Sequence, residues 1–212
     1  MKKLVIVSLM FLLCSVMVKS VSGSDYKTYQ EITFEHKGAT LLSEYGDSDF
    51  KKYYEKMKGK RFWGWRTFTV YKDEELSFID DTLYVIVNEG TTAIDETIKL
   101  SRNYSLKKQY TVSGSLGIKA NGSEKGFKLG LEEEIDSTIS TTVSGSVEES
   151  YSMKIEVDPG TKVSIQIKGE GQITNGVAKY YRFWKNVKKG GFEIFWITTE
   201  YYSIEKVKID ED

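Results

Sequence analysis

Strict alternation of apolar and polar side chains across residues 98–157 restricts the fold of this chain more than any other feature. From 127 to 157, eleven of the sixteen odd positions are apolar, and none of the fifteen even positions is. From 98 to 120 the apolar residues fall on even positions, interrupted by Arg102, Lys108 and Gly114. A period of two is typical of an extended strand with one apolar and one polar face.

The two alternating segments predict one long antiparallel hairpin, formed by residues 98–120 and 127–157. They are joined by residues 121–126, whose Asn, Gly and Ser content is typical of a turn. Pairing Ala120 with Phe127 would place Leu100 opposite Val147 and would bring the apolar row of one strand opposite the apolar row of the other. A slip of one residue would oppose apolar to polar side chains, so the parity of the register is fixed, whereas a slip of two residues stays open.

The remaining sequence predicts a mainly β protein, built as an elongated antiparallel sheet or sandwich. Aromatic and β-branched residues favour strands at 31–34, 61–71, 82–87, 163–167, 180–184 and 192–202. The Lys-Lys-Gly-Gly sequence at 188–191 favours a turn between the last two. Aromatic residues at helical spacing indicate one short helix near 48–58. We expect an N-terminal α+β part of the body over 24–97 and an elongated β domain over 98–212.

The first 23 residues have the composition of a secretory signal peptide. Lys2 and Lys3 precede an apolar run from Leu4 to Val18, and small residues lead to a cleavage position after Gly23. The run is shorter than the roughly 20 residues of a membrane-spanning helix. We therefore expect a secreted, extracellular protein.

Composition argues against two broad classes of function. The chain has 30 basic and 31 acidic residues, which lacks the basic excess of a nucleic-acid-binding protein. His36 is the only histidine and Cys14 the only cysteine. The chain therefore has too few thiolate and imidazole groups for a Cys/His metal site or for most nucleophilic catalytic relays. We expect no enzymatic activity, no cofactor and no metal.

An amphipathic hairpin of this length suits a membrane β-barrel that several chains assemble together. A barrel strand needs about 9 to 11 residues with apolar side chains outward and polar side chains inward, and residues 111–120 and 127–136 supply two such strands. The candidates for facing lipid are Val112, Leu116, Ile118, Phe127, Leu129, Leu131 and Ile135. The candidates for lining the pore are Thr111, Ser113, Ser115, Lys119, Lys128, Glu132, Glu134 and Asp136.

The Ser/Thr-rich stretches at 111–115 and 137–152, followed by Val157-Asp158-Pro159-Gly160, resemble the aerolysin-like family of β-pore-forming proteins, which includes the epsilon-toxin and mosquitocidal-toxin group. The resemblance covers residues 98–170. It implies an elongated all-β body, a hairpin that inserts into membranes, and partners that are other copies of the chain and a lipid membrane. The sequence departs from the pattern at its polar turn, which carries Glu124 and Lys125, and at Glu133, which would face lipid.

Two alternatives remain open from the sequence. The apolar face of the hairpin would also suit a long sheet that only packs on the rest of the chain. Such a protein could be a non-lytic, envelope-associated module that binds a glycan or a cell-surface receptor through exposed aromatic residues. The aromatic candidates for such a site are Trp63, Trp65, Tyr181 and Trp184, and core packing is the competing role for each.

Overall fold

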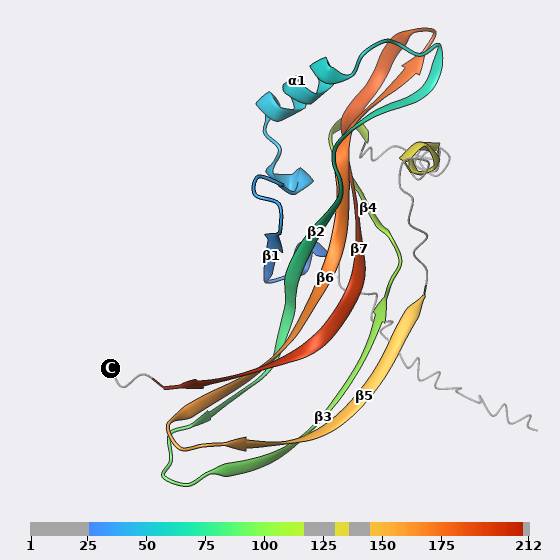
Figure 1. Cartoon of the computed structure of the whole chain (residues 1–212). Helices are drawn as coiled ribbons and strands as arrows, with labels where there is room; N and C mark the ends of the chain where they lie inside the picture. The colour runs from blue at the N-terminus through green and yellow to red at the C-terminus, as the bar shows by residue number, and fades with distance from the viewer. Residues whose placement is uncertain (1–25, 117–129, 136–144, 210–212) are drawn as a thin grey trace, which may run out of the picture.

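The molecule is elongated and curved, and three long strands run along most of its length (Figure 1). The computed structural model describes residues 26–116, 130–135 and 145–209. The long strands are β2 (Trp63–Asn88), β6 (Thr161–Arg182) and β7 (Lys185–Lys208), of 26, 22 and 24 residues. Ordinary strands have about 3 to 10 residues. The prediction of a mainly β, elongated antiparallel protein is confirmed.

These strands form the centre of a five-stranded antiparallel sheet, ordered β1-β2-β6-β7-β4. The short strands β1 (Glu31–Phe34) and β4 (Gln109–Val112) lie at its edges. The long strands bend where their register shifts, and β2 has four such irregularities against β6. At one of them Asp73 has a left-handed backbone, with φ of 51°, and its N–H donates to Thr174 Oγ1 at 2.9 Å.

Two expected interruptions of the long strands are absent, and a third lies elsewhere. The single strand β2, which begins at Trp63, fills the gap expected between residues 71 and 82, and the single strand β6 fills the gap expected between 167 and 180. The turn expected at 188–191 is wrong, because Phe183 and Trp184 form the turn between β6 and β7. The glycines serve close packing instead, since a Cβ at Gly190 would lie 2.0 Å from the Ser113 carbonyl oxygen.

A separate two-stranded sheet, the β3–β5 ribbon, consists of β3 (Ile94–Ser105) and β5 (Ser146–Val157). The expected parity is confirmed, because even residues of β3 pair with odd residues of β5. The register differs by four residues from the one predicted, since Leu100 lies opposite Tyr151 rather than Val147. The boundary expected between residues 97 and 98 falls inside β3.

The N-terminal segment lies against the sheet and carries the helix α1 (Asp47–Lys56), which confirms the helix expected near 48–58. Tyr53 of this helix packs with Met57 and Val177. Before it come the short 3₁₀ turns η1 (Tyr26–Thr28) and η2 (Leu42–Glu44).

A buried carboxylate, Glu193 of β7, holds this segment in place. Its oxygens accept hydrogen bonds from the Tyr26 hydroxyl and the Leu42 N–H, both at 2.6 Å, and from Asn175 Nδ2 at 3.2 Å. Burial raises the pKa of Glu193, while the three hydrogen bonds act in the opposite direction. Glu193 therefore joins the N-terminal segment to the sheet by hydrogen bonds to both of its 3₁₀ turns.

Candidate functional site

The β3–β5 ribbon has the apolar and polar faces that its sequence predicts. Ile98 and Leu100 are buried and form a cluster with Ile165 of β6, against which Met153, Ile155 and Tyr202 also pack. The alternate residues Lys99, Ser101, Ser152 and Lys154 are exposed. In the described structure the ribbon belongs to no other sheet, so side chains rather than strand pairing hold it to the body.

One charged cluster interrupts the apolar contact between the ribbon and the sheet. Arg102 of β3, whose side chain is 8% exposed, donates to Glu149 of β5 at 2.6 and 2.9 Å and to the backbone carbonyl of Glu200 on β7. Its guanidinium also lies over the rings of Tyr104 and Tyr202, at 4.8 and 4.9 Å from their centroids. Arg102 therefore contacts both strands of the ribbon and the sheet beneath it.

The carboxylate of Glu200 is incompletely hydrogen-bonded in this cluster. Its Oε2 lies 4.0 Å from Arg102 Nη1, and among the described residues neither atom has a hydrogen-bond partner. Burial raises the pKa of Glu200 to about 7, with Asp80 and Glu149 acting in the same direction and Arg102 opposing them. Near neutral pH the buried carboxylate therefore exists in both protonation states.

We expect the stability of the protein to fall as pH rises through about 7. The folded state binds a proton at Glu200 that the unfolded state, with an ordinary pKa of 4.5, releases. The resulting stabilisation is complete below that value and is lost above the folded-state pKa, by about 1 to 3 kcal/mol. Urea unfolding of wild type and Glu200→Gln across this range measures it. Glu200→Gln should be the more stable protein above neutrality, and equal pH slopes in both proteins would contradict the assignment.

The lipid-facing candidates nearer the turn are not strand residues here, with one exception. Val112 ends β4, which pairs with β7 rather than with the other half of a hairpin. Leu116 lies in the 3₁₀ turn η3 (Gly114–Leu116), and Leu131 and Ile135 lie in a helical segment at 130–135. The expectation of strand for 130–135 is thus wrong in this state. Leu116, Leu131 and Ile135 are buried with Trp65, Phe192 and Trp196. Their burial in this cluster stabilises a helix and a turn where the sequence alone favours strands.

The pore-lining candidates are similarly divided. Thr111 pairs with Glu193 in the β4–β7 ladder, and the Ser113 hydroxyl accepts from the Gly191 N–H at 3.2 Å. Ser115 belongs to η3. Glu132 and Glu134 are on the helical segment, where Glu134 makes a 2.9 Å ion pair with Arg61. Three pore-lining candidates, Lys119, Lys128 and Asp136, and three lipid-facing candidates, Ile118, Phe127 and Leu129, lie outside the described residues.

The four aromatic candidates separate into core and surface. Trp65 and Tyr181 are each 4% exposed, so their assignment as binding residues is wrong and they are core. Trp63 and Trp184 are 49% and 58% exposed. Phe62 and Phe183, which sequence reasoning did not single out, are exposed beside them.

Phe62, Trp63, Phe183 and Trp184 form one surface cluster, called the aromatic tip below. The Phe62 ring lies 5.3 Å from Phe183 and 4.6 Å from Trp184, and Trp63 lies 5.7 Å from Phe183, as distances between ring centroids. The tip occupies the end of the molecule where β2 begins and β6 turns into β7.

The turn that carries two of these residues is conformationally costly. Phe183 and Trp184 have φ of 48° and 60°, a region that hairpin turns usually fill with Asn and Gly. Large aromatic residues there cost of order 1 kcal/mol each, and such strain is concentrated at functional sites. The tip is therefore a candidate contact surface.

Several solved structures are similar to the chain at low sequence identity. The Cry23Aa1 and Cry37Aa1 binary protein complex is 12% identical, with 76% of this chain and 88% of that chain covered and a TM-score of 0.27. A non-toxic crystal protein from Bacillus thuringiensis is 9% identical, with 71% and 85% covered and a TM-score of 0.27. An aerolysin-like protein from Bombina maxima is 10% identical, with 68% and 99% covered and a TM-score of 0.25.

The matched structures thus include an aerolysin-like protein, from the family that the sequence resembles. TM-scores this low correspond to loose superposition, so the matches carry nothing about activity. No protein-family model and no curated protein matches the chain. None of the helices within the described ranges has the length and apolar composition needed to cross a membrane.

Proposed function

We propose that this chain is a secreted protein that assembles on target membranes and opens residues 98–157 into one hairpin of a shared β-barrel pore. The observation that carries the proposal is the β3–β5 ribbon, an amphipathic strand pair that shares no backbone ladder with the described body sheet. Within lipid every backbone amide needs a partner, so only helices and closed barrels span. If the ribbon leaves the body with its own ladder intact, some of its backbone amides are already hydrogen-bonded before it enters the membrane.

The connection between β3 and β5 supports the same proposal. It starts with β4, whose four residues pair with the end of the sheet formed by β7, and continues into η3 and the helical segment at 130–135. A short edge strand, one 3₁₀ turn and a six-residue helical segment can be displaced at lower cost than the long strands. In the proposed pore this segment refolds into the barrel strands for which 111–120 and 127–136 have the length and alternation.

The proposal is tested by tying β4 to β7 with a disulfide. Tyr110 and Ile194 are directly opposite each other, and the Ser113 N–H bond to the Gly191 carbonyl places them at a narrow, non-hydrogen-bonded pair. Cα atoms at such a pair are about 4.5 Å apart, within the range that a disulfide bridges. The only natural cysteine is Cys14, inside the expected signal peptide.

We expect oxidised Tyr110→Cys/Ile194→Cys protein to bind vesicles but release little of their trapped dye, and reduction to restore release. Each single variant under the same oxidant is the matched control. Full release by the oxidised double variant, with the disulfide verified by mass, would overturn the proposed refolding of β4.

The exposed aromatic tip favours one second candidate, a non-lytic module that binds a glycan or surface receptor. This candidate predicts retention on cells or cell walls without dye release from any vesicle. Loss of retention after Trp184→Ala, with an unchanged unfolding temperature and with no dye release from any vesicle by wild type, would support it over the pore.

A further inference from the structure

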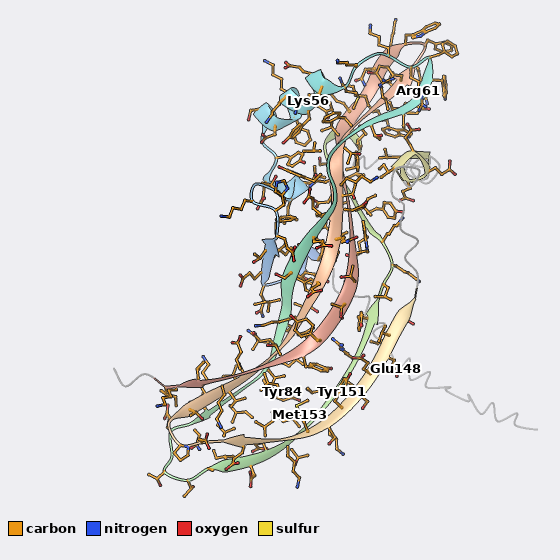
Figure 2. All side chains as sticks on the ribbon, viewed as in Figure 1. Lys56, Arg61, Tyr84, Glu148, Tyr151 and Met153 are labelled. Carbon is orange, nitrogen blue, oxygen red and sulfur yellow. The ribbon has the colours of Figure 1, made fainter. Side chains whose placement is uncertain are left out.

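Positive charge is concentrated at the end of the molecule that carries the aromatic tip. Residues 56–72 include six Lys or Arg residues, residues 171–192 include five, and neither segment contains an Asp or Glu. The whole chain, by contrast, has 30 basic and 31 acidic residues. Figure 2 shows Lys56 and Arg61 toward this end, and Tyr84, Glu148, Tyr151 and Met153 toward the other.

Strand register turns this local composition into a row of cations. Arg66 of β2 lies opposite Lys179 of β6, which lies opposite Lys189 of β7. These three residues, called the basic row below, occupy neighbouring strands at one level of the sheet. Like charges directly opposite each other destabilise a sheet. An anion bound beside the row would therefore offset this repulsion.

The basic row borders an open cavity between α1 and the β6–β7 hairpin. The cavity has a volume of about 710 Å³ and is lined by Lys51, Lys179, Lys189, Phe50 and Tyr54, among others. The ammonium groups of Lys179 and Lys189 lie 4.9 and 5.4 Å from the centroid of the same Tyr54 ring. Lys179 Nζ also donates to the Tyr54 carbonyl oxygen at 3.2 Å. Two cations from adjacent strands thus meet at one aromatic wall.

The charges around this cavity favour an anionic ligand. Burial lowers the pKa of Lys179, and Lys189 lowers it further. The acidic residues Asp47 and Glu55 also line the cavity, so its lining has one more basic than acidic residue. The helical segment at 130–135 lies beside Trp65, on the sheet face opposite Arg66, and its Glu134 is paired with Arg61. Because acidic residues share the cavity with the lysines, the anion that fits best is a small one that contacts Lys179 and Lys189.

The aromatic tip lies only a few residues beyond the basic row on the same strands. Trp63 pairs with Arg182, whose guanidinium lies 5.2 Å from the centroid of the Trp63 ring. Exposed aromatic side chains lie at the headgroup level of a bilayer, and nearby Lys and Arg bind anionic lipid headgroups. The aromatic tip at the end of the molecule, with the cations a few residues behind it, matches this combination of headgroup contacts.

We propose that this end of the molecule binds an anionic phospholipid surface, with the lipid phosphate held by Lys179 and Lys189 and the aromatic tip in the headgroup layer. The inference deepens the proposed function, because it names the membrane chemistry that the protein recognises before any hairpin inserts.

The experiment measures co-sedimentation of the full chain with phosphatidylcholine vesicles, with and without phosphatidylglycerol. Wild type should bind the anionic vesicles, more weakly as salt rises. Lys179→Gln/Lys189→Gln should lower the partition coefficient about 10- to 30-fold, since each basic residue near such a surface contributes roughly three- to fivefold. The matched control, Lys154→Gln/Lys162→Gln, changes two exposed lysines on β5 and β6 away from the tip and should bind like wild type.

A second variant tests the tip without risking the fold. Phe183→Asn/Trp184→Gly installs the residues that this left-handed turn prefers, so the protein should be at least as stable as wild type. It should nevertheless lose most vesicle binding, whereas Tyr201→Ser, at a 44% exposed aromatic residue elsewhere on β7, should not. Unchanged binding by either tip-end double variant would overturn the inference.

Two further readouts identify the ligand and separate the two proposals. Inorganic phosphate that raises the unfolding temperature of a protein with no affinity for anionic vesicles would make free phosphate the ligand and overturn the membrane assignment. Dye release is recorded separately. Binding without release would overturn the pore and leave this inference standing, and release that does not depend on Lys179 and Lys189 would do the reverse.

Discussion

Replacing Arg102 by methionine is expected to loosen the β3–β5 ribbon from the sheet and to cost about 3 to 5 kcal/mol of stability above neutral pH. The guanidinium is buried between Glu149 of β5 and Glu200 of β7, and its loss leaves Glu200 without a nearby cation. The loss should be smaller at acidic pH, where Glu200 is neutral. Urea unfolding gives the total cost, and amide exchange in 94–105 and 146–157 shows whether the ribbon opens first.

Two companion proteins make the Arg102 experiment specific. Arg102→Met/Glu200→Gln should recover part of the lost stability, because neutralising the abandoned carboxylate removes its desolvation cost. Lys99→Met, at an exposed position on the other face of β3, should change stability little. On the proposed function, Arg102→Met should also release vesicle dye faster than wild type. Slower exchange in the ribbon than in β6 would contradict a role for Arg102 in holding it.

The ribbon could be predicted from the sequence because its information is local. Alternation along 94–105 and 146–157 fixes which face of each strand is buried, and burial of that face fixes the parity of pairing. The exact register could not be predicted, because the prediction assumed one regular ladder up to residue 120, and residues 106–116 do not continue the ladder of the ribbon. The chain leaves the ribbon after Ser105, and the following strand β4 pairs with β7. The alternation of side chains within the hairpin does not specify this pairing. Arg102 was recognised only as an interruption, since its partner Glu200 is 98 residues away.

The helical segment at 130–135 was missed because its spacing fits two structures. Leu131 and Ile135 are four residues apart, which places them on one face of a strand and also on one face of a helix. Contacts with Trp65 and Trp196, distant in sequence, accompany the helix in this state. A segment whose pattern satisfies both periods is also the kind that a change of environment can refold.

The aromatic tip was only partly predictable for a related reason. Lys188-Lys189-Gly190-Gly191 is a stronger turn signal than Phe183-Trp184, so sequence reasoning placed the turn several residues too late. Paired glycines allow close approach of another backbone as well as a turn, and only the neighbouring segment distinguishes the two. The basic row could not be predicted either, because the position of the β6–β7 turn sets the pairing of Lys179 with Lys189.

Gly190→Ala is expected to displace η3 from the sheet and to destabilise the protein by about 1 to 3 kcal/mol. A methyl group at this position would lie 2.0 Å from the Ser113 carbonyl oxygen and 2.6 Å from Leu116 Cγ. The nearer of these is backbone, so no side-chain rotation relieves it. Leu116 belongs to the cluster that buries Leu131 and Ile135, so the helical segment should loosen with η3. Amide exchange across 110–116 and 130–135, together with urea unfolding, measures both effects.

Gly46→Ala is the matched control for Gly190→Ala. A methyl group there would meet only Asp49 Oδ2 and Ser48 Oγ, at 3.6 and 3.8 Å, which are ordinary contacts, and should cost less than about 1 kcal/mol. Gly190→Ala protein with wild-type stability and wild-type exchange would show that η3 does not rest on β7. If η3 does rest there, the proposed pore predicts faster dye release by Gly190→Ala, because the segment that must refold is already partly detached. Slower release by a protein whose η3 is loosened would count against refolding of this segment as the step that opens the pore.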